Sequence, residues 1–202
     1  MTEPVHSLRR LDGGVGRRGI PASAAGRRAG GQEDHSRGKM AIRDAAQGKA
    51  KGKPTVATIG YQGATVPGFL NVLRRARIDL LVDIRAVASS RRPGFSKTQL
   101  AASLEEAGID YVHLRSLGTP ASGRAAARAD RFGEMRAIYR EHLATHEAQS
   151  ELGTLIDLIR SGRRVCLLCF ETDATNCHRS IVAAEVAARL PVKVTHLAGA
   201  SE

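Results

Sequence analysis

Residues 163–179 read RRVCLLCFETDATNCHR, and the fold is inferred from this stretch outward. Its apolar run, 165–170, is short, which predicts a strand buried on both faces of a sheet. Asp173, Thr175 and Asn176 follow, and these residue types cap the start of a helix. The stretch is therefore predicted to form a strand, a turn and a helix. In α/β proteins such a turn lies at the carboxyl end of a parallel strand, where ligands bind.

The remaining sequence repeats this alternation. Strands are predicted at 55–60, 78–84, 109–113, 165–169 and 192–196. Helices are predicted after Thr65, after Ser96 with Gln99 as a capping box, along the apolar stripes of 132–143 and 152–159, and from 177 to 190. The alternation predicts a parallel sheet with helices on both faces, so we expect a single Rossmann-like, three-layer α/β domain with a mostly parallel sheet of about five strands.

One segment of the expected domain shows no such pattern. Residues 119–130 contain Ala, Gly, Ser and Arg without apolar periodicity, which predicts a loop. This loop is either a lid that carries Arg124 and Arg128 over a site or a plain surface excursion.

The net charge of +11 is concentrated at the amino end. Residues 1–53 hold 12 Lys and Arg against 5 Asp and Glu, whereas residues 54–202 hold 19 against 15. The first segment also holds 10 of the 21 glycines and no aromatic residue, a composition that cannot bury enough surface to fold. We expect a disordered basic tail before an α/β domain at 54–202. The tail is either a misassigned leader, with Met40 as the alternative start, or an arm that contacts nucleic-acid phosphates.

Cysteine content and hydropathy predict the compartment. Three cysteines, with Cys166 and Cys169 inside one predicted strand, make a poor disulfide framework and fit a reducing environment. No stretch approaches the roughly 20 apolar residues that span a bilayer, and the amino end lacks the apolar core of a secretory signal. We expect a cytoplasmic protein without a membrane partner. The heavy use of Ala, Arg and Gly indicates a bacterial source.

Polar residues gather at the predicted strand ends. Because parallel strands share one carboxyl edge, we expect the following side chains on the same edge of the sheet: Tyr61, Asp83, Arg85, His113, Arg115, Cys169 and Glu171. A charge in an apolar strand needs a partner, so Asp83 and Arg85 form either a structural ion pair or part of the ligand crevice. The turn Gly60-Tyr61-Gln62-Gly63 is either a tight strand-to-helix connection or a phosphate contact.

Several short motifs occur in order along the expected domain. They are 58–63 (TIGYQG), 81–85 (LVDIR), 90–96 (SRRPGFS), 109–111 (IDY), 117–118 (LG), 168–171 (LCFE) and 177–179 (CHR). Together they resemble the prokaryotic family catalogued as domain of unknown function 488, over residues 55 to about 197. The resemblance implies a compact α/β domain whose characteristic residues are these positions, and it implies no particular reaction.

Cys177, His178 and Arg179 open the last predicted helix. The helix dipole and neighbouring positive charge lower the pKa of a thiol in this place, so Cys177 is a candidate nucleophile. On a helical wheel Arg179 lies on the inner face, whereas His178 lies on the solvated side. Arg179 is therefore either aimed at an anion in the crevice or paired with Glu171 or Asp83.

Spacing argues against two other kinds of site. A thiol phosphatase loop needs Cys and Arg on one short loop, whereas nine residues separate Cys169 from Arg179. Cys166 and Cys169 face opposite sides of a strand, which leaves Cys169, Cys177 and His178 as an incomplete zinc set. We therefore predict no metal and no other cofactor. Stacking of single-stranded nucleic acid is disfavoured by an aromatic content of 3%, although a groove of arginines could still hold phosphates.

Two hypotheses follow. The first is an enzyme, a hydrolase or transferase, that acts on a phosphate-bearing or nucleotide-like ligand. Its candidate catalytic residues are Cys169, Glu171, Cys177, His178, Arg179 and Asp83, and its candidate ligand-binding residues are Tyr61, Gly63, Arg85, Ser90, Arg91, Phe95 and Arg115. Glu171 or Asp83 would act as general acid or base, and Cys177 or Cys169 as nucleophile. The second hypothesis is a non-catalytic module that binds nucleic acid or a regulatory partner.

Overall fold

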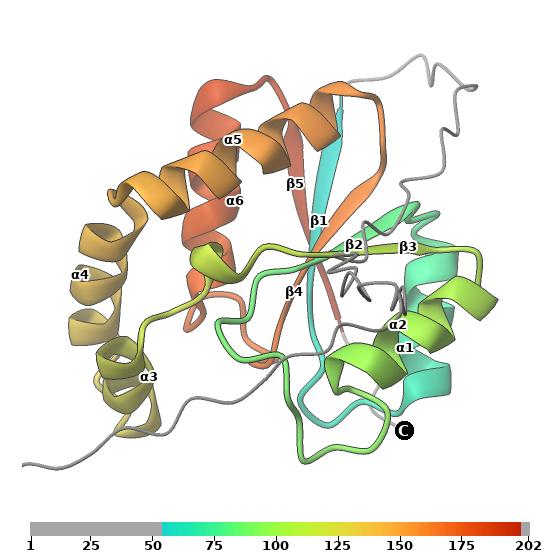
Figure 1. Cartoon of the computed structure of the whole chain (residues 1–202), viewed down its shortest axis with the longest axis horizontal. Coiled ribbons are helices and arrows are strands. Elements are labelled where there is room, and N and C mark those ends of the chain that lie inside the picture. The colour runs from blue at the N-terminus through green and yellow to red at the C-terminus, as the bar shows by residue number, and fades with distance from the viewer. Residues whose placement is uncertain (1–53, 199–202) are drawn as a thin grey trace, which may run out of the picture. The chain divides into compact units, whose positions relative to one another are not determined.

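The structure, a computed structural model, describes residues 54–198 of the 202-residue chain (Figure 1). The expected basic tail at 1–53, including Met40, lies outside the described residues, and so do residues 199–202. Each of the five predicted strands is present: β1 (Thr55–Gly60), β2 (Leu80–Asp83), β3 (Asp110–His113), β4 (Val165–Cys169) and β5 (Lys193–Leu197).

The five strands form one parallel sheet in the order β3-β2-β4-β1-β5. β4 lies at its centre, paired with β1 on one side and β2 on the other. Its residues alternate between the faces, so that Val165 and Leu167 join one apolar cluster, while Cys166 and Leu168 join the other. The predicted α/β fold is confirmed, and the described sheet is wholly parallel. Its strand ends share one carboxyl edge, which bears the candidate site.

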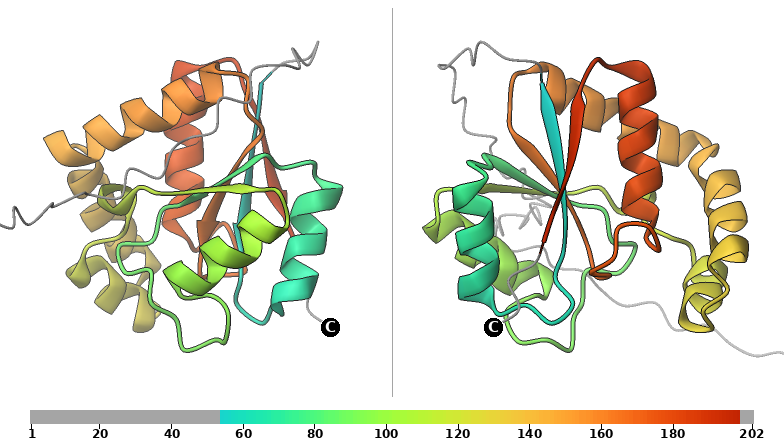
Figure 2. Two further views of the ribbon diagram at one scale, coloured as in Figure 1. Left: turned by 45° about the vertical axis from the view of Figure 1, so that its right-hand side comes forward. Right: turned by 180° about the vertical axis from the view of Figure 1, so that it is seen from behind.

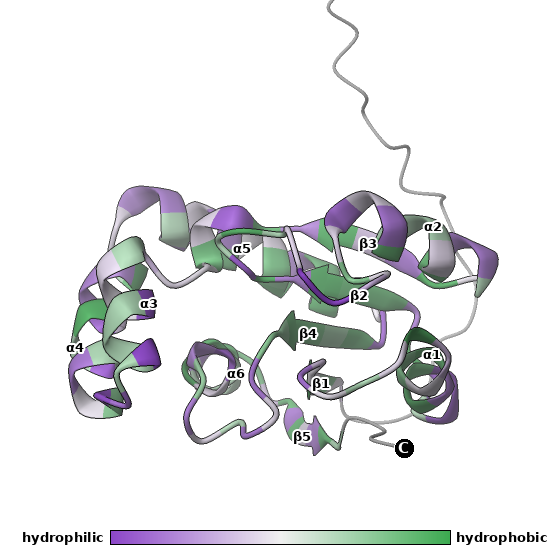
Figure 3. Ribbon diagram, turned by 90° about the horizontal axis from the view of Figure 1, so that it is seen from below, coloured by the Kyte–Doolittle hydropathy of each residue, from purple (hydrophilic) through white to green (hydrophobic). Residues whose placement is uncertain are grey.

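Helices cover both faces of the sheet, as Figures 2 and 3 show. α1 (Val66–Arg75) and α2 (Lys97–Glu106) bury side chains such as Phe69 and Leu100 on one face. α5 (His146–Arg160) and α6 (His178–Arg189) pack on the other face, where α4 (Phe132–Leu143) adds Met135 and Tyr139 to the same cluster. The domain therefore has three layers. Among residues 54–198, no helix is long and apolar enough to cross a membrane.

The segment predicted as a loop at 119–130 contains a helix, α3 (Ala121–Arg128). Alanine is the strongest helix former, and the residues that α3 buries, Gly123 and Ala126, are small. A Cβ on Gly123 would meet Thr119 Cγ2 at 2.7 Å, so only glycine lets the helix start pack so closely. The loop prediction is wrong because close packing of small side chains leaves no apolar stripe in the sequence.

Polar residues at the helix starts act only partly as predicted. Thr65 caps α1, since its Oγ1 accepts a hydrogen bond from a backbone N–H of the first turn. Ser96 precedes α2, but its Oγ exchanges hydrogen bonds with the backbone N and O of Ser90, so the capping box with Gln99 does not form. Asp173 accepts hydrogen bonds within its own turn and does not cap α6. Ser96 and Asp173 therefore stabilise loops at the carboxyl edge of the sheet and do not cap helices.

The end of β1 runs against the chain that follows β4. A Cβ built on Gly60 would stand 1.8 Å from the carbonyl oxygen of Glu171 and 3.1 Å from Arg179 Nη1. Gly60 is buried, so no side chain at this position could turn outward. This close approach holds the turn after β1 against the turn after β4.

Gly60→Ala is expected to lower the free energy of unfolding by about 3 kcal/mol, because the new Cβ must displace backbone. Gly153→Ala in α5 is the matched control, since nothing lies within 4 Å of a Cβ added there. That change should raise stability by about 0.5–1 kcal/mol through helix propensity. Urea unfolding followed by circular dichroism measures both, and a shift of the same sign for the two variants would contradict the close approach.

Candidate functional site

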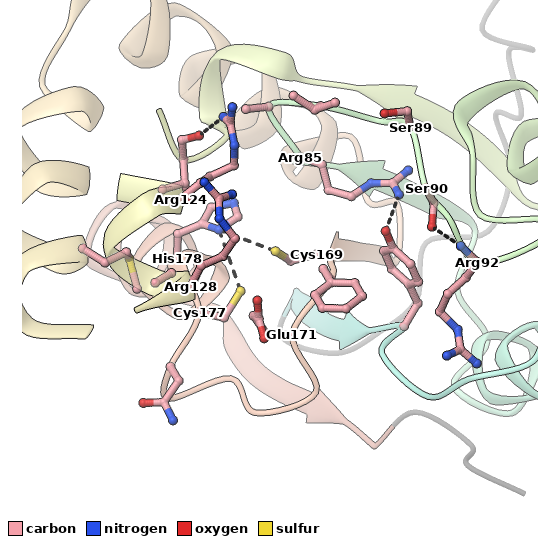
Figure 4. A pocket seen from close by; sticks show the side chains of 18 of the residues that line it. Arg85, Ser89, Ser90, Arg92, Arg124, Arg128, Cys169, Glu171, Cys177 and His178 are labelled. Atoms are coloured by element: carbon pink, nitrogen blue, oxygen red, sulfur yellow. Dashed lines mark hydrogen bonds between the residues drawn. The ribbon is translucent and has the colours of Figure 1, made fainter. Parts of the chain in front are cut away.

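A cavity of about 570 Å³ opens at the carboxyl edge of the sheet (Figure 4). We call it the arginine pocket, because five arginines line it: Arg85, Arg91, Arg92, Arg124 and Arg128. The connection after β2 supplies the first three, and α3 supplies the other two. The remaining lining includes Tyr61, Ser89, Ser90, Thr119, Phe170, Glu171, Asn176, and the group formed by Cys169, Cys177 and His178.

Asp83 and Arg85 form a buried ion pair at the base of this cavity. Arg85 Nε and Nη2 donate to the two carboxylate oxygens of Asp83 at 2.8 and 2.6 Å. Tyr111 Oη donates to Asp83 at 2.6 Å, while Arg85 Nη1 donates to Tyr61 Oη at 3.0 Å and to the Phe95 carbonyl at 2.9 Å. Burial lowers the pKa of Arg85, but the hydrogen bonds and charge of Asp83 outweigh it and raise the pKa. Burial, followed by the charge of Asp83, raises the pKa of Tyr111.

The two alternatives for this pair, a structural ion pair or a part of the ligand crevice, have different outcomes for Asp83 and Arg85. Asp83 is 0% exposed and lies outside the described lining of the pocket, which favours the structural ion pair over a place in the ligand crevice. Arg85 is part of the ion pair and also lines the pocket. Tyr61 and Phe95 stack with ring centroids 4.6 Å apart, and the Arg85 guanidinium lies 5.0 Å from the Tyr61 centroid. Phe95, a predicted ligand-binding residue, therefore supports the base of the pocket.

Two thiols and an imidazole meet at the inner end of the pocket (Figure 4). His178 Nδ1 lies 3.6 Å from Cys169 Sγ and 3.8 Å from Cys177 Sγ. Its Nε2 lies 3.0 Å from the carbonyl oxygen of Ile84. A carbonyl can only accept, so Nε2 carries the hydrogen and Nδ1 faces the thiols. The structure therefore joins residues from the end of β4 and the start of α6 into one group.

The burial of His178 corrects the helical-wheel prediction. His178 is 5% exposed, although the wheel places it on the solvated side of α6. The ring of Tyr139, from α4, packs on the imidazole with 5.0 Å between centroids. A helical wheel describes a single helix, so it cannot show that a residue of a second helix, here Tyr139 of α4, buries His178.

The two thiols of this group have opposite pKa shifts. Burial raises the pKa of Cys177, but a hydrogen bond from Cys169 and the charges of His178 and Arg179 outweigh it and hold that pKa well below its ordinary value. The hydrogen bond to Cys177, together with burial and the charge on Cys177, raises the pKa of Cys169 well above the ordinary value. The predicted lowering of the Cys177 thiol pKa is therefore matched by its surroundings.

Arg179 has a role that differs from both predicted alternatives. It is 1% exposed, and its Nη2 donates to the Thr172 carbonyl at 2.7 Å. Its Nη1 donates to the Glu171 carbonyl, and its Nε donates to Thr58 Oγ1 at 3.3 Å. Arg179 is not aimed at the crevice, because its donors are directed at the backbone of the turn after β4. Arg179 ties this turn to β1.

Glu171 remains a candidate acid or base. Its side chain is partly buried and lines the pocket. Burial, and then the negative charge of Cys177, raise the pKa of Glu171, while Arg179 and His178 act in the opposite direction. A raised pKa moves a carboxyl group toward the range in which general acids and bases act.

The other predicted residues divide into two groups. Tyr61, Ser90 and Arg91 line the arginine pocket, as Figure 4 shows for Ser90. Gly63, at φ +79°, serves the turn after β1, where few side chains are tolerated. Arg115 lies apart from the pocket and lines a second cavity of about 600 Å³.

Some pocket residues were not among the predicted site residues. Arg124 and Arg128 were assigned to a loop, but they lie four residues apart on α3 and both line the pocket. The spacing of four is the signal that could have placed them on one helix face. Phe170 and Asn176 lie beside predicted site residues in the sequence and also line the pocket. Their place in the turn that follows β4 is the signal that could have found them.

Comparison with known proteins identifies a family. A family model described as Domain of unknown function DUF488 matches residues 65–186. The matched span runs from the start of α1 into α6 and includes the Asp83–Arg85 pair and the cysteine–histidine group. No curated protein and no solved structure matches the chain.

Arg179→Ala is expected to lower the free energy of unfolding by about 3 kcal/mol. The carbonyls of Glu171 and Thr172 would lose a charged donor, and a hydrogen bond to a charged group contributes roughly 1.5–3 kcal/mol. Arg189→Ala is the matched control, because Arg189 lies on the same helix and is exposed; its effect should stay within about 0.5 kcal/mol. Urea unfolding measures both, and equal losses would contradict the structural role of Arg179.

Proposed function

The chain belongs to the family described as domain of unknown function DUF488, and we propose that it is a hydrolase or transferase acting on a phosphate-bearing or nucleotide-like ligand in the arginine pocket. One observation carries the proposal: five arginines line the cavity together with a single described carboxylate, Glu171. The pocket lies at the carboxyl edge of a parallel sheet, where α/β proteins bind ligands. Its volume of about 570 Å³ is within the range of roughly 300–1,000 Å³ typical of small-molecule sites.

The arginines are suited to an oxyanion with several acceptors. A guanidinium group matches phosphate in a bidentate geometry, and neighbouring cations in a partly buried cavity favour an anion between them. Arg92 Nη2 donates to the Ala64 carbonyl at 2.9 Å, whereas its Nε is buried and has no hydrogen-bond partner among residues 54–198. Arg124 is oriented by a bond of 2.8 Å from its Nη1 to the Thr119 carbonyl. Among residues 54–198, Arg91 and Arg128 form no side-chain hydrogen bond or ion pair, so their donors are available to a phosphate.

An aromatic ring beside these cations favours a nucleotide-like ligand over bare phosphate. Phe170 lines the pocket and is 40% exposed, an unusual position for a large apolar side chain. Its ring meets Tyr61 edge to face, with centroids 5.3 Å apart, which holds it in place. A held, exposed ring offers a stacking surface for a base.

The groups able to react with such a ligand lie at the inner end of the pocket. Glu171 is the candidate general acid or base, and the group of Cys169, Cys177 and His178 supplies the other reactive atoms. Asp83 and Arg179 leave the catalytic set, because their hydrogen bonds are internal to the protein.

Binding is tested with the full chain and a panel of ligands: inorganic phosphate, nucleoside mono-, di- and triphosphates, the unphosphorylated nucleosides, and short RNA and DNA oligonucleotides. Calorimetry should detect a phosphorylated nucleotide and show no binding of its nucleoside. Arg91→Ala and Arg128→Ala should each weaken binding about tenfold, since a lost charge-assisted hydrogen bond costs roughly 1.5 kcal/mol or more.

Arg160→Ala is the control for these two variants, because Arg160 is an exposed arginine that pairs with Asp157 on α5, outside the described lining. Equal weakening by Arg160→Ala, or the absence of any nucleotide binding, would contradict the proposal. Oligonucleotide binding that survives both pocket variants would favour the non-catalytic nucleic-acid module instead.

Turnover is tested with the nucleotide that binds best. Incubation with the wild-type chain should convert the nucleotide, either by releasing phosphate or by transferring a group to an added acceptor. Phosphorus NMR and chromatography detect the products. Glu171→Gln should retain nucleotide affinity and lose at least about 100-fold in rate, the usual contribution of a positioned acid or base. Binding without turnover in the wild-type chain would indicate a binding module and exclude the enzyme.

A further inference from the structure

Cys169, Cys177 and His178 present three soft ligand atoms to one point. The two Sγ atoms and Nδ1 lie within 4.8 Å of one another, with Nδ1 3.6 Å and 3.8 Å from the two sulfurs. A tetrahedral zinc ion, with bonds of about 2.3 Å to sulfur and about 2.0 Å to nitrogen, holds such ligands about 3.5 Å apart. We propose that these three residues bind Zn²⁺ at the inner end of the arginine pocket.

The orientation of His178 supports this proposal independently of the distances. A histidine that ligates a metal through one ring nitrogen usually donates the other N–H to a carboxylate or a backbone carbonyl. His178 Nε2 donates to the Ile84 carbonyl at 3.0 Å, which directs the lone pair of Nδ1 toward the two sulfurs. The Tyr139 ring packs against the imidazole of His178, with 5.0 Å between ring centroids, and so fixes its orientation. In the neutral ring, the bond to the Ile84 carbonyl therefore places the free nitrogen, Nδ1, on the side of the two sulfurs.

The backbone around the three residues is equally constrained. Cys169 ends the central strand, in register with Gly60 on the neighbouring strand. Cys177 and His178 are consecutive at the start of α6, and Arg179 ties the preceding turn to β1. Ligands held on rigid elements bind a metal without a free-energy cost for reorganisation of the chain.

Charge balance favours a dication in this place. All three residues are buried, and a Zn²⁺ ion that displaces the thiol protons would neutralise the two thiolates that its binding creates. Zn²⁺ with two thiolates and a neutral imidazole forms a neutral group. Thiolate and imidazole ligands together select zinc over the hard cations Mg²⁺ and Ca²⁺.

The number of ligands indicates an open site. The sequence-based prediction of no metal treated three ligands as too few, but three protein ligands are the number that catalytic zinc sites use, with the fourth position left to water or substrate. Cys169, Cys177 and His178 all line the arginine pocket, so the fourth position would be reached from the cavity that Glu171 also lines. The inference goes beyond the proposed function and stands whether or not the pocket binds phosphate.

The test uses the full chain, reduced, stripped of metal with a chelator and kept without oxygen. Co²⁺ is titrated as a spectroscopic substitute for Zn²⁺, and absorption is recorded. One equivalent should produce thiolate-to-cobalt charge transfer in the near ultraviolet and intense tetrahedral bands in the visible region. One equivalent of Zn²⁺ should then remove both sets of bands and raise the melting temperature of the chain.

Cys169→Ser, Cys177→Ser and His178→Gln should each weaken Co²⁺ binding by more than the roughly 10- to 100-fold that loss of an outer-shell partner costs. Cys166→Ser is the matched control, because Cys166 is buried on the opposite face of the same strand. Cys166→Ser should leave the spectrum and stoichiometry unchanged.

Three results would overturn the proposal: a reduced, folded wild-type chain without charge-transfer bands or a zinc-dependent melting shift, loss of the bands in Cys166→Ser, or a Cys169–Cys177 disulfide that persists under the reducing conditions. The wild-type measurement decides the matter even if a ligand variant does not fold. Arg128→Ala separates the two proposals, because it should lose nucleotide affinity and keep the cobalt spectrum.

Discussion

The arginine pocket depends on the ion pair between Asp83 and Arg85. A buried charge is costly unless it is paired and its remaining hydrogen-bonding atoms are satisfied. Asp83 meets this condition by accepting from Arg85 and from Tyr111 on β3, and Arg85 meets it by donating to Tyr61 and to the Phe95 carbonyl. Tyr61 follows β1, Tyr111 belongs to β3 and Phe95 precedes α2. One ion pair therefore joins three parts of the carboxyl edge. The segment that carries Ser89 to Arg92 starts from this pair, so the pair positions the lining.

Arg179 performs a related task on the other side of β4. Both Arg85 and Arg179 are buried and donate hydrogen bonds to the protein itself. Arg85 donates to the carboxylate of Asp83, and Arg179 donates to carbonyls of the turn after β4. The close approach of Gly60 to Glu171 completes this arrangement, because it leaves no room for the turn to shift. The remaining pocket arginines are only partly neutralised by the described residues around them. Arg179 thus serves the protein alone, whereas Arg85 is both an ion-pair partner and part of the pocket lining.

The two proposals for the pocket are physically compatible. A neutral zinc group formed from two thiolates and an imidazole would leave the positive field of the arginines available for a phosphate. The ligand atom near the cysteine–histidine group would then contact the metal, while Glu171 lies beside it to transfer a proton. Cys166 shows the contrast with an ordinary buried thiol. It lies among apolar residues on the opposite face of β4, where burial raises its pKa.

The amino-acid sequence by itself determined the five strands, their parallel arrangement and the carboxyl edge that bears the candidate site, because apolar runs and alternation with helices are local patterns. From those patterns followed the strand-end residues Arg85, Cys169 and Glu171. Only the tertiary structure decided three features: the burial of His178, the place of Arg124 and Arg128, and the partners of Arg179. Each depends on a contact between distant segments. α4 covers His178, α3 forms by packing of small residues, and the partners of Arg179 are backbone carbonyls, which no side-chain pattern records.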